Sequence, residues 1–264
     1  MGALDDIAFL ARSQNRVAVL ETLTAGLYDR AALREATGIP RPTVGRIIND
    51  FQARGLVIQR GNQYTTSPLG DFLATEFQSL LEGAETMRKL RGVVEWLPTD
   101  EFDFTLDHFA DATITTPRPG DPTAPVRRSV ALAREAAHIR FISGAFVPPI
   151  YEVIWQRTIH EDQTAVAVLS DDVIDMMRED PEVAELARET ISSGGATLYR
   201  CAHPCSYQMA VVDEALVALL VLDDDGHAHA VIDTEDEAVL SWVASTIDVH
   251  QREAHLLDSD SFTV

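Results

Sequence analysis

Residues 29–66 contain the pattern that most restricts the fold: two short helical patterns separated by a tight turn and followed at once by a hairpin pattern. The first, "DRAALREAT", begins at Asp29, a favourable N-cap residue, and ends before Gly38, a favourable turn residue after a helix. The second, "PRPTVGRIINDFQARG", repeats apolar residues at i, i+3, i+4 and i+7, namely Val44, Ile47, Ile48 and Phe51. The sequence therefore predicts two helices, of which the second follows the first at once after the turn at Gly38.

The segment after the second helix predicts a small hairpin. "LVIQRGNQYTT" has two short strand patterns around a Gly61-Asn62 turn, and "SQNRVAVLETLTAG" upstream predicts a further helix. Helix, turn, helix and hairpin occur in this order in a winged helix-turn-helix. We therefore predict a winged helix-turn-helix DNA-binding domain over residues 1–82, with its wing at about 56–66.

The distribution of charge supports a surface for a polyanion in this part of the chain. The 264 residues include 42 acidic and 21 basic side chains, giving a net charge of −21, and Lys89 is the only lysine. Lysine-poor acidity resembles that of haloarchaeal proteins and favours a halophilic origin, although an acidic mesophilic protein is the alternative. Within Arg30–Arg60, six arginines accompany only two acidic residues. This island indicates a nucleic-acid surface, or else a solvated helix face.

The second helix of this pair is the expected recognition helix. Arg41 and Arg46 can each donate two hydrogen bonds to guanine, and Thr43 can contact a thymine methyl group or a phosphate. Pro42 suits the first helical turn. From the wing, Arg60 and Asn62 can reach the DNA backbone or the minor groove. The alternative is an adaptor that uses a winged helix only for protein contact.

The same stretch carries a family resemblance. "GIPRPTVGRIINDFQARGLV" followed by "YTTSPLG" resembles the recognition helix, wing and exit of winged-helix regulators of the broad ArsR/MarR-like group. The resemblance covers about residues 10–82 and implies binding to double-stranded DNA.

A long apolar periodicity follows the hairpin. Ser67–Pro98 has apolar residues at helical spacing, which predicts one long helix or two helices broken near Gly83. We expect residues 83–107 to form a helical connector. Its apolar face can pack on its own domains or pair with a second copy, and we favour a homodimer because palindromic operators require dimers.

Alternating helix and strand patterns begin at Val126 and predict an α/β domain over residues 108–264. The strands that follow helices should be parallel and central, and the last two strands should form an antiparallel edge. The segments "DATITTPRPGDPTAPVRR", "FISGAF", "VLSDDVIDMM" and "MAVVDEALVALLVLDDDGHAHAVIDTEDEAVLSW" resemble the C-terminal domain of the archaeal methanogenesis regulatory (FilR-type) family. This resemblance implies a fold similar to a truncated phospholipase D-like domain, used as a ligand sensor.

Catalytic motifs are missing from the sequence. A phospholipase D site needs His-x-Lys-x4-Asp, and Lys89 has no histidine two residues before it. The chain has no GxxxxGK[ST], GxSxG or HExxH motif. We therefore expect a catalytically inactive domain that binds a ligand, and a protein that is not an enzyme and needs no cofactor.

The expected ligand site lies beyond the carboxyl ends of the strands, as in other open α/β sheets. Hydroxyl groups, an acid and backbone amides there suit a small polar metabolite such as a sugar or an organic acid; they belong to Ser143, Gly144, Ser170, Asp171, His203 and Tyr207. The alternative is that Ser170 and Asp171 only cap the next helix.

"CAHPC" offers a second kind of sensor. Cys201, His203 and Cys205 are ligand types for a transition metal, and the two thiols can also form a redox switch. Single-residue gaps, Pro204 and the lack of a fourth ligand match a structural zinc site poorly, so a metal is not the favoured interpretation. The competing interpretation is that the cysteines have no functional role.

Targeting signals are not evident in the sequence. "MGALDDIAFLARSQ" lacks the basic and apolar regions of a signal peptide, and the longest apolar run, Ala215–Leu222, is too short for a membrane span. We expect a cytoplasmic protein without a membrane partner, and a homodimeric transcription regulator that binds DNA and a small-molecule effector.

Overall fold

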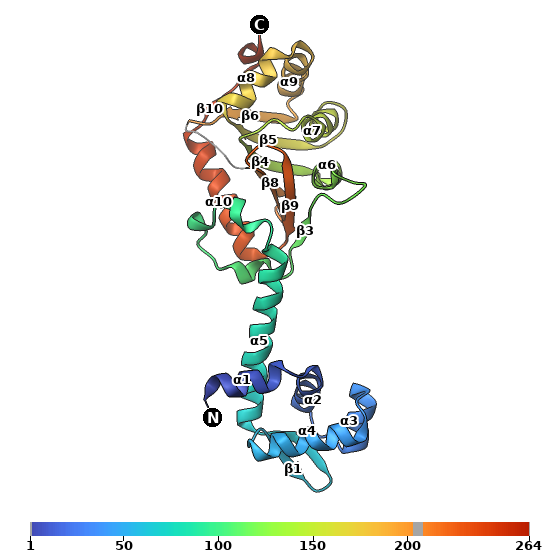
Figure 1. Ribbon diagram of the computed structural model, residues 1–264. Helices are drawn as coiled ribbons and strands as arrows, with labels where there is room; N and C mark the ends of the chain where they lie inside the picture. The colour runs from blue at the N-terminus through green and yellow to red at the C-terminus, as the bar shows by residue number, and fades with distance from the viewer. Residues whose placement is uncertain (1, 203–207, 264) are drawn as a thin grey trace. The chain divides into compact units, whose positions relative to one another are not determined.

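The computed structural model describes residues 2–202 and 208–263 and divides the chain into two units, Met1–Glu85 and Thr86–Val264 (Figure 1). The N-terminal unit is mainly helical, and the C-terminal unit is built on a large mixed sheet. Among the described residues, no helix is long and apolar enough to cross a membrane.

The N-terminal unit contains the helices and the hairpin that the sequence predicts, preceded by a helix over Ala3–Ala11 that the sequence did not predict. The elements are α1 (Ala3–Ala11), α2 (Gln14–Thr24), α3 (Arg30–Thr37), α4 (Arg41–Ala53), β1 (Val57–Arg60), β2 (Gln63–Thr66) and the first part of α5 (Pro68–Leu90).

The predicted helix boundaries in this unit are confirmed. Asp29 Oδ1 accepts hydrogen bonds from the N–H groups of Ala31 (2.8 Å) and Ala32 (2.9 Å), so it caps α3. Gly38 ends α3 in the left-handed conformation, with φ of 70°. The apolar stripe of α4 lies in the core of the unit, where Val44 and Phe51 have no exposed surface. Burial of four such side chains, each contributing about 1.5–3 kcal/mol, fixes the orientation of α4.

The hairpin has the two-residue turn expected from Gly61-Asn62. The strands pair in antiparallel register with Arg60 opposite Gln63, and Gly61 has φ of 63°. A positive φ at the first turn residue suits glycine and is typical of tight hairpins. Arg60 and Asn62 therefore lie at the tip of the hairpin.

The segment 83–107 differs from the expected connector. Helix α5 ends at Leu90, and three short 3-10 turns follow: η1 (Val94–Trp96), η2 (Thr99–Glu101) and η3 (Leu106–Phe109). Leu90, Val93 and Leu97 are buried in the core of the C-terminal unit. Phe102 and Phe104 stack at 4.7 Å and also contact the Trp242 ring. The many aromatic and aliphatic side chains of this segment gain more from burial against the sheet than from a free helical surface.

The sheet of the C-terminal unit has eight strands in the order β10-β6-β5-β4-β7-β8-β9-β3. β4, β5 and β6 are parallel neighbours, and every other pair is antiparallel. The strands are β3 (Thr113–Thr115), β4 (His138–Ser143), β5 (Thr164–Leu169), β6 (Ala196–Arg200), β7 (Gln208–Val212), β8 (Leu216–Leu222), β9 (Ala228–Thr234) and β10 (His255–Leu256).

The sheet confirms the α/β class but corrects the expected edge. The last long pair, β8 and β9, is antiparallel as predicted, yet it is interior because β3 covers β9. β10 pairs with β6 at the opposite edge. The two edge strands have three and two residues, and such short strands give no periodic signal in a sequence.

Helices cover both faces of this sheet (Figure 1). One face packs on α10 (Glu237–Glu253), through Val239, Val243 and Ile247. The other face packs on the four remaining helices, α6 (Ala124–Glu135), α7 (Pro148–His160), α8 (Asp171–Glu179) and α9 (Pro181–Ser193). Alternation along each central strand therefore sends side chains into two separate cores.

Candidate nucleic-acid interface and ligand cavity

The outward face of α4 carries the predicted DNA-contacting side chains. Arg41, Pro42 and Arg46 are exposed, and Thr43 is half-buried beside Val44. Within residues 2–202 and 208–263, Arg41 and Arg46 make no hydrogen bond or ion pair with another side chain. Their guanidinium groups are thus available to an external anion.

Other arginines of the same unit have structural partners. Arg54 Nη1 lies 2.7 Å from Asp6 Oδ1, and its guanidinium carbon lies 3.9 Å from the centre of the Phe9 ring. Arg16 stacks on the same ring at 4.0 Å and pairs with Asp50 at 3.6 Å. Arg16 and Arg54 therefore hold α1 against the rest of the unit, whereas Arg41 and Arg46 on α4 have no such role.

The tip of the hairpin presents a second exposed basic group. Arg60 and Asn62 are exposed on either side of Gly61. Gln59 Nε2 donates a hydrogen bond to the Gly61 carbonyl oxygen at 2.7 Å, which fixes the turn. A cation at the tip of a short hairpin suits contact with a phosphate.

The strand ends of the C-terminal unit bring four of the predicted ligand residues together. The Ser170 N–H donates to the Ser143 carbonyl oxygen at 3.0 Å, and Ser170 Oγ lies 3.5 Å from the Gly144 carbonyl oxygen. Ser170 Oγ also accepts from the Val173 N–H at 3.3 Å, so this side chain caps α8. Arg200 holds Asp171 through two hydrogen bonds, which lower the pKa of that carboxyl group. The side chains of Ser170 and Asp171 therefore have local structural roles.

The remaining predicted site residues lie mainly outside the described part of the chain. His203, Cys205 and Tyr207 fall in residues 203–207, which the structure does not describe. Cys201 is described: its thiol is buried, and its N–H donates to the Leu169 carbonyl oxygen at 2.8 Å. The metal and thiol hypotheses for "CAHPC" therefore stay predictions.

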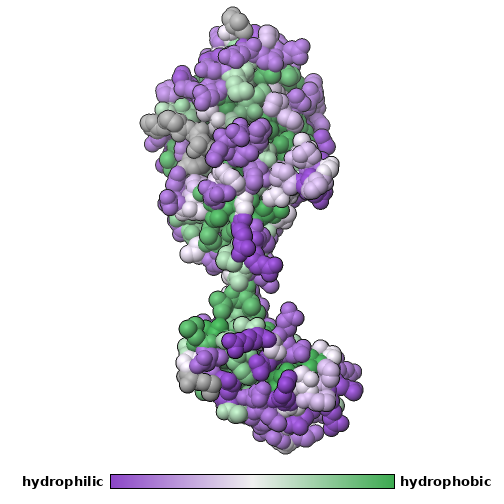
Figure 2. All heavy atoms as spheres, viewed as in Figure 1, coloured by the Kyte–Doolittle hydropathy of each residue, from purple (hydrophilic) through white to green (hydrophobic). Residues whose placement is uncertain are grey.

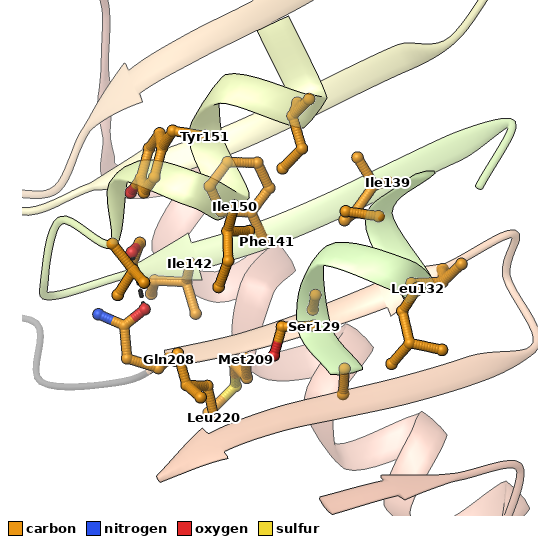
Figure 3. Close-up of a pocket in the computed structure, with 17 residues that line it drawn as sticks. Ser129, Leu132, Ile139, Phe141, Ile142, Ile150, Tyr151, Gln208, Met209 and Leu220 are labelled. Carbon is orange, nitrogen blue, oxygen red and sulfur yellow. Dashed lines mark hydrogen bonds between the residues drawn. The ribbon is translucent and has the colours of Figure 1, made fainter. Parts of the chain in front are cut away.

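A cavity lies between α6, α7 and the sheet, and the sequence did not predict it (Figure 3). It offers about 60 Å³ to the centres of water-sized molecules. Gln208, at the start of β7, lies at one end of the lining, and Leu132 and Ile139 lie at the other. Seventeen residues line it: Ser129, Leu132, Ala133, Ile139, Phe141, Ile142, Ser143, Val147, Ile150, Tyr151, Ile154, Gln208, Met209, Ala210, Val212, Ala218 and Leu220. Of the predicted ligand residues, Ser143 belongs to this lining.

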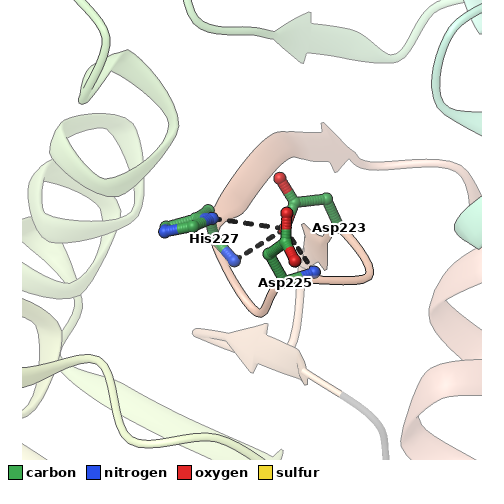
Figure 4. Close-up of side chains that lie close together, drawn as sticks. All are labelled: Asp223, Asp225 and His227. Carbon is green, nitrogen blue, oxygen red and sulfur yellow. Dashed lines mark hydrogen bonds and ion pairs between the residues drawn. The ribbon is translucent and has the colours of Figure 1, made fainter.

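A cluster of possible metal ligands occupies the turn between β8 and β9 (Figure 4). One ligand atom each from Asp223, Asp225 and His227 lies within 4.8 Å of the other two. Asp223 Oδ1 accepts from the N–H groups of His227 (2.9 Å) and Asp225 (3.0 Å), which lowers the pKa of Asp223. These backbone bonds are those of an ordinary turn and account for the arrangement without a metal.

Solved structures similar to this chain have low sequence identity. TrmBL2, described as an archaeal chromatin protein with a novel mode of DNA binding, is 13% identical with a TM-score of 0.42, over 95% of this chain and 99% of its own. Nuc from Salmonella typhimurium, a phospholipase D family member, is 11% identical with a TM-score of 0.44, over 56% of this chain and 99% of its own. A putative IclR-family transcriptional regulator from Rhodococcus sp. is 16% identical with a TM-score of 0.21, over 93% and 94%.

Family models give the assignment. No curated protein matches the chain. Residues 4–89 match the HVO_A0261 N-terminal domain, and residues 122–253, half of the chain, match the middle domain of methanogenesis regulatory protein FilR1. The resemblance of the C-terminal half that the sequence suggested is thereby confirmed. The chain belongs to the FilR1 family of archaeal transcriptional regulators.

Proposed function

We propose that this protein is a homodimeric transcriptional regulator that binds specific DNA sequences through a winged helix-turn-helix and senses a small molecule through its C-terminal unit. Membership of a family of regulators supports the regulatory part. The sequence specificity, the dimer and the effector go beyond that assignment.

The observation that carries the proposal is the pair of exposed arginines on α4. The chain has a net charge of −21, yet Arg41 and Arg46 project from the outward face without an acidic partner among the described residues. An arginine at this place can donate two hydrogen bonds to a guanine in the major groove. Arg60 at the hairpin tip suits the flanking backbone.

Exposed apolar side chains of the N-terminal unit support a dimer. Figure 2 shows apolar side chains gathered over the exposed part of α5. Leu69 and Phe72 are each 66% exposed and Leu80 is 53% exposed, all on α5, and Leu4 on α1 is 81% exposed. Soluble monomers rarely expose a group of large apolar side chains in this way, so a second copy of the unit is the proposed cover.

The proposal assigns binding rather than catalysis to the C-terminal unit. The sole lysine of the chain, Lys89, lies on α5, donates to the Ala110 carbonyl oxygen and has no histidine two residues before it. The motif of that chemistry is missing from the sequence, which supports a sensor without enzymatic activity.

The test is DNA binding by an Arg46→Ala variant. Genomic footprinting of the tagged protein first identifies its sites, and the affinity for a recovered site is then measured by fluorescence anisotropy. We expect the variant to lose about 1–3 kcal/mol of discrimination in favour of the specific site, because one bidentate base contact is lost. Arg46 is exposed, so the variant should stay folded.

Arg12→Ala is the matched control. It removes the same charge from an exposed arginine of the same unit, at the end of α1. Equal effects of the two substitutions would mean that α4 does not read base edges. A lack of discrete genomic sites would instead favour the adaptor hypothesis, in which the winged helix contacts protein.

A further inference from the structure

We propose that the cavity between α6, α7 and the sheet binds a small, neutral and mainly apolar molecule that carries one hydrogen-bonding group. This inference names the ligand class of the proposed sensor and rests on that proposed function. It replaces the polar metabolite that the strand ends suggested with a different chemistry at a neighbouring place.

Two small residues, paired on adjacent strands of the sheet, form the floor of the cavity. Ala210 on β7 pairs with Ala218 on β8, and Ala210 also pairs with Phe141 on β4. The next residues on the same face of β7 and β8, Val212 and Leu220, are larger. The alanine pair therefore creates room that a central sheet usually fills with branched side chains.

The walls come from helices that do not fully cover this floor. Val147 and Ile150, at the start of α7, remain half-buried, as do Ala218 and Leu220 on β8. Leu132 and Ala133 on α6 are buried and form the opposite wall. Apolar surface that is half-buried around a hollow gains free energy when an apolar ligand displaces its water.

One end of the cavity is polar. Ser143 Oγ lies 2.8 Å from Gln208 Oε1 and 2.9 Å from the Ala145 carbonyl oxygen, and its single hydrogen can be donated to either acceptor. Gln208 Nε2 donates to the same carbonyl oxygen at 3.1 Å. Among the described residues, this leaves the Gln208 amide one further N–H and one further lone pair, so it can both donate to and accept from a ligand hydroxyl group.

Charge decides the class of ligand. None of the seventeen described lining residues is acidic or basic. A carboxylate or an amine would therefore lose its hydration without a counter-ion, which costs several kcal/mol, whereas a hydroxyl group needs only the Gln208 amide. The neighbouring strand ends are less suitable, because Ser170 caps α8 and Asp171 is held by Arg200.

Size restricts the ligand further. On the scale by which one water needs roughly 10–15 Å³, the cavity holds roughly four to six waters. A molecule with a single six-membered ring and one hydroxyl group displaces about that number of waters. Phenol, toluene and benzoate are therefore suitable probes, since they share a ring and differ in the polar group.

The experiment measures binding of these three probes to the full-length protein by calorimetry and by methyl NMR of Ile150, which lines the cavity on the α7 side. We expect saturable binding of phenol and toluene and none of benzoate. Phenol should bind about threefold to tenfold more tightly than toluene, because of one additional hydrogen bond. Gln208→Leu should remove that preference while toluene still binds.

Ala218→Ile should fill the cavity and abolish binding of both neutral probes. Ala228→Ile, on the neighbouring strand β9 and outside the lining, is the matched control and should leave binding unchanged. Ala210→Val is a second filling variant in case isoleucine at 218 perturbs the sheet. Binding of benzoate alone, no binding of any probe, or phenol binding that survives both filling variants would overturn the proposal.

The affinity for DNA is measured separately in the same variants without a probe. If the wild-type protein binds no specific DNA site, the proposed function is wrong. The result of the probe experiment is unaffected by that outcome. Normal DNA binding with no probe binding would overturn only the cavity.

Discussion

At the scale of single residues, two helical glycines of the N-terminal unit differ in the space that a side chain would have. A Cβ atom on Gly45 in α4 would meet only Arg30 Nη1, at 3.8 Å. A Cβ atom on Gly70 in α5 would lie 2.0 Å from the Leu56 carbonyl oxygen. The sequence alone presents both as glycines within helical patterns, and only the packing of α5 against Leu56 separates them.

We expect Gly45→Ala to raise the free energy of unfolding by about 0.5–1 kcal/mol, through helix propensity. Gly70→Ala should lower it by about 1–3 kcal/mol, because α5 must move away from Leu56. Urea unfolding should be followed by circular dichroism, since Trp96, Trp155 and Trp242 all lie in the C-terminal unit. If both variants changed the free energy of unfolding in the same direction, the difference proposed between Gly45 and Gly70 would be wrong.

The exposed positions of the candidate DNA-contacting side chains could be predicted because they depend on local sequence, and their contact with DNA stays a prediction. Asp29 begins α3 and Gly38 ends it before α4, and the stripe at Val44 and Ile47 fixes which face of α4 is outward. The cavity could not be predicted, because the small pair Ala210 and Ala218 meets only through the register of β7 and β8. No spacing in the sequence records that pairing.

At the scale of elements, the long helices and central strands were predictable and the short elements were not. Strands β3 and β10 have three and two residues and depend on neighbours far away in the sequence. The helical pattern after Leu90 was misleading, because apolar spacing continues into 3-10 turns that pack on the sheet. Periodicity identifies a buried face and does not by itself determine the backbone that presents it.

The start of α10 gives an element-scale prediction. Asp236 Oδ1 accepts from the N–H groups of Ala238 (2.9 Å) and Val239 (3.2 Å) and lies 3.0 Å from His108 Nδ1. Burial raises the pKa of Asp236, and the bonds from His108 and the two N–H groups outweigh burial, so its pKa lies below the ordinary value. Its ionised form therefore stabilises the folded state.

Asp236→Ala should lower the free energy of unfolding by about 1–2 kcal/mol at neutral pH, because the cap is lost. Since the folded pKa is depressed, the contribution of the charge is complete above the unfolded value of about 3.9 and disappears as pH falls through the folded pKa. The difference between wild type and variant should therefore shrink at acidic pH. Urea unfolding followed by tryptophan fluorescence at several pH values measures it.

Asp236→Asn is the control for this prediction. Asparagine caps a helix about as well as aspartate but carries no charge. The loss of unfolding free energy in Asp236→Asn should therefore be smaller than in Asp236→Ala at neutral pH. As the pH is lowered, it should reach zero before the loss in Asp236→Ala does. A constant deficit for Asp236→Ala down to about pH 3 would show that the charge contributes nothing.

At the scale of the whole molecule, the acidic composition opposes association of two copies, and the exposed apolar side chains favour it. Two copies of a chain with a net charge of −21 repel at low ionic strength. Salt screens this repulsion, and the apolar contact through Phe72 and its neighbours remains. Salt weakens DNA binding at the same time, since log affinity falls by about 0.9 for each neutralised phosphate per log unit of salt.

We therefore expect sedimentation equilibrium to show a dimer whose dissociation constant falls as KCl rises toward about 2 M. Phe72→Glu should weaken the dimer by about a hundredfold or more, because an unpaired carboxylate would be buried in the contact at a cost of about 3 kcal/mol. Leu27→Glu adds the same charge at another exposed leucine of the unit, 44% exposed, and should leave the dimer intact. A wild-type monomer at every KCl concentration, or equal weakening by both variants, would remove α5 as the dimer contact. Base-edge contacts by Arg46 would then have to supply specificity from one copy alone, which would be difficult at about 2 M KCl because salt weakens the phosphate contacts.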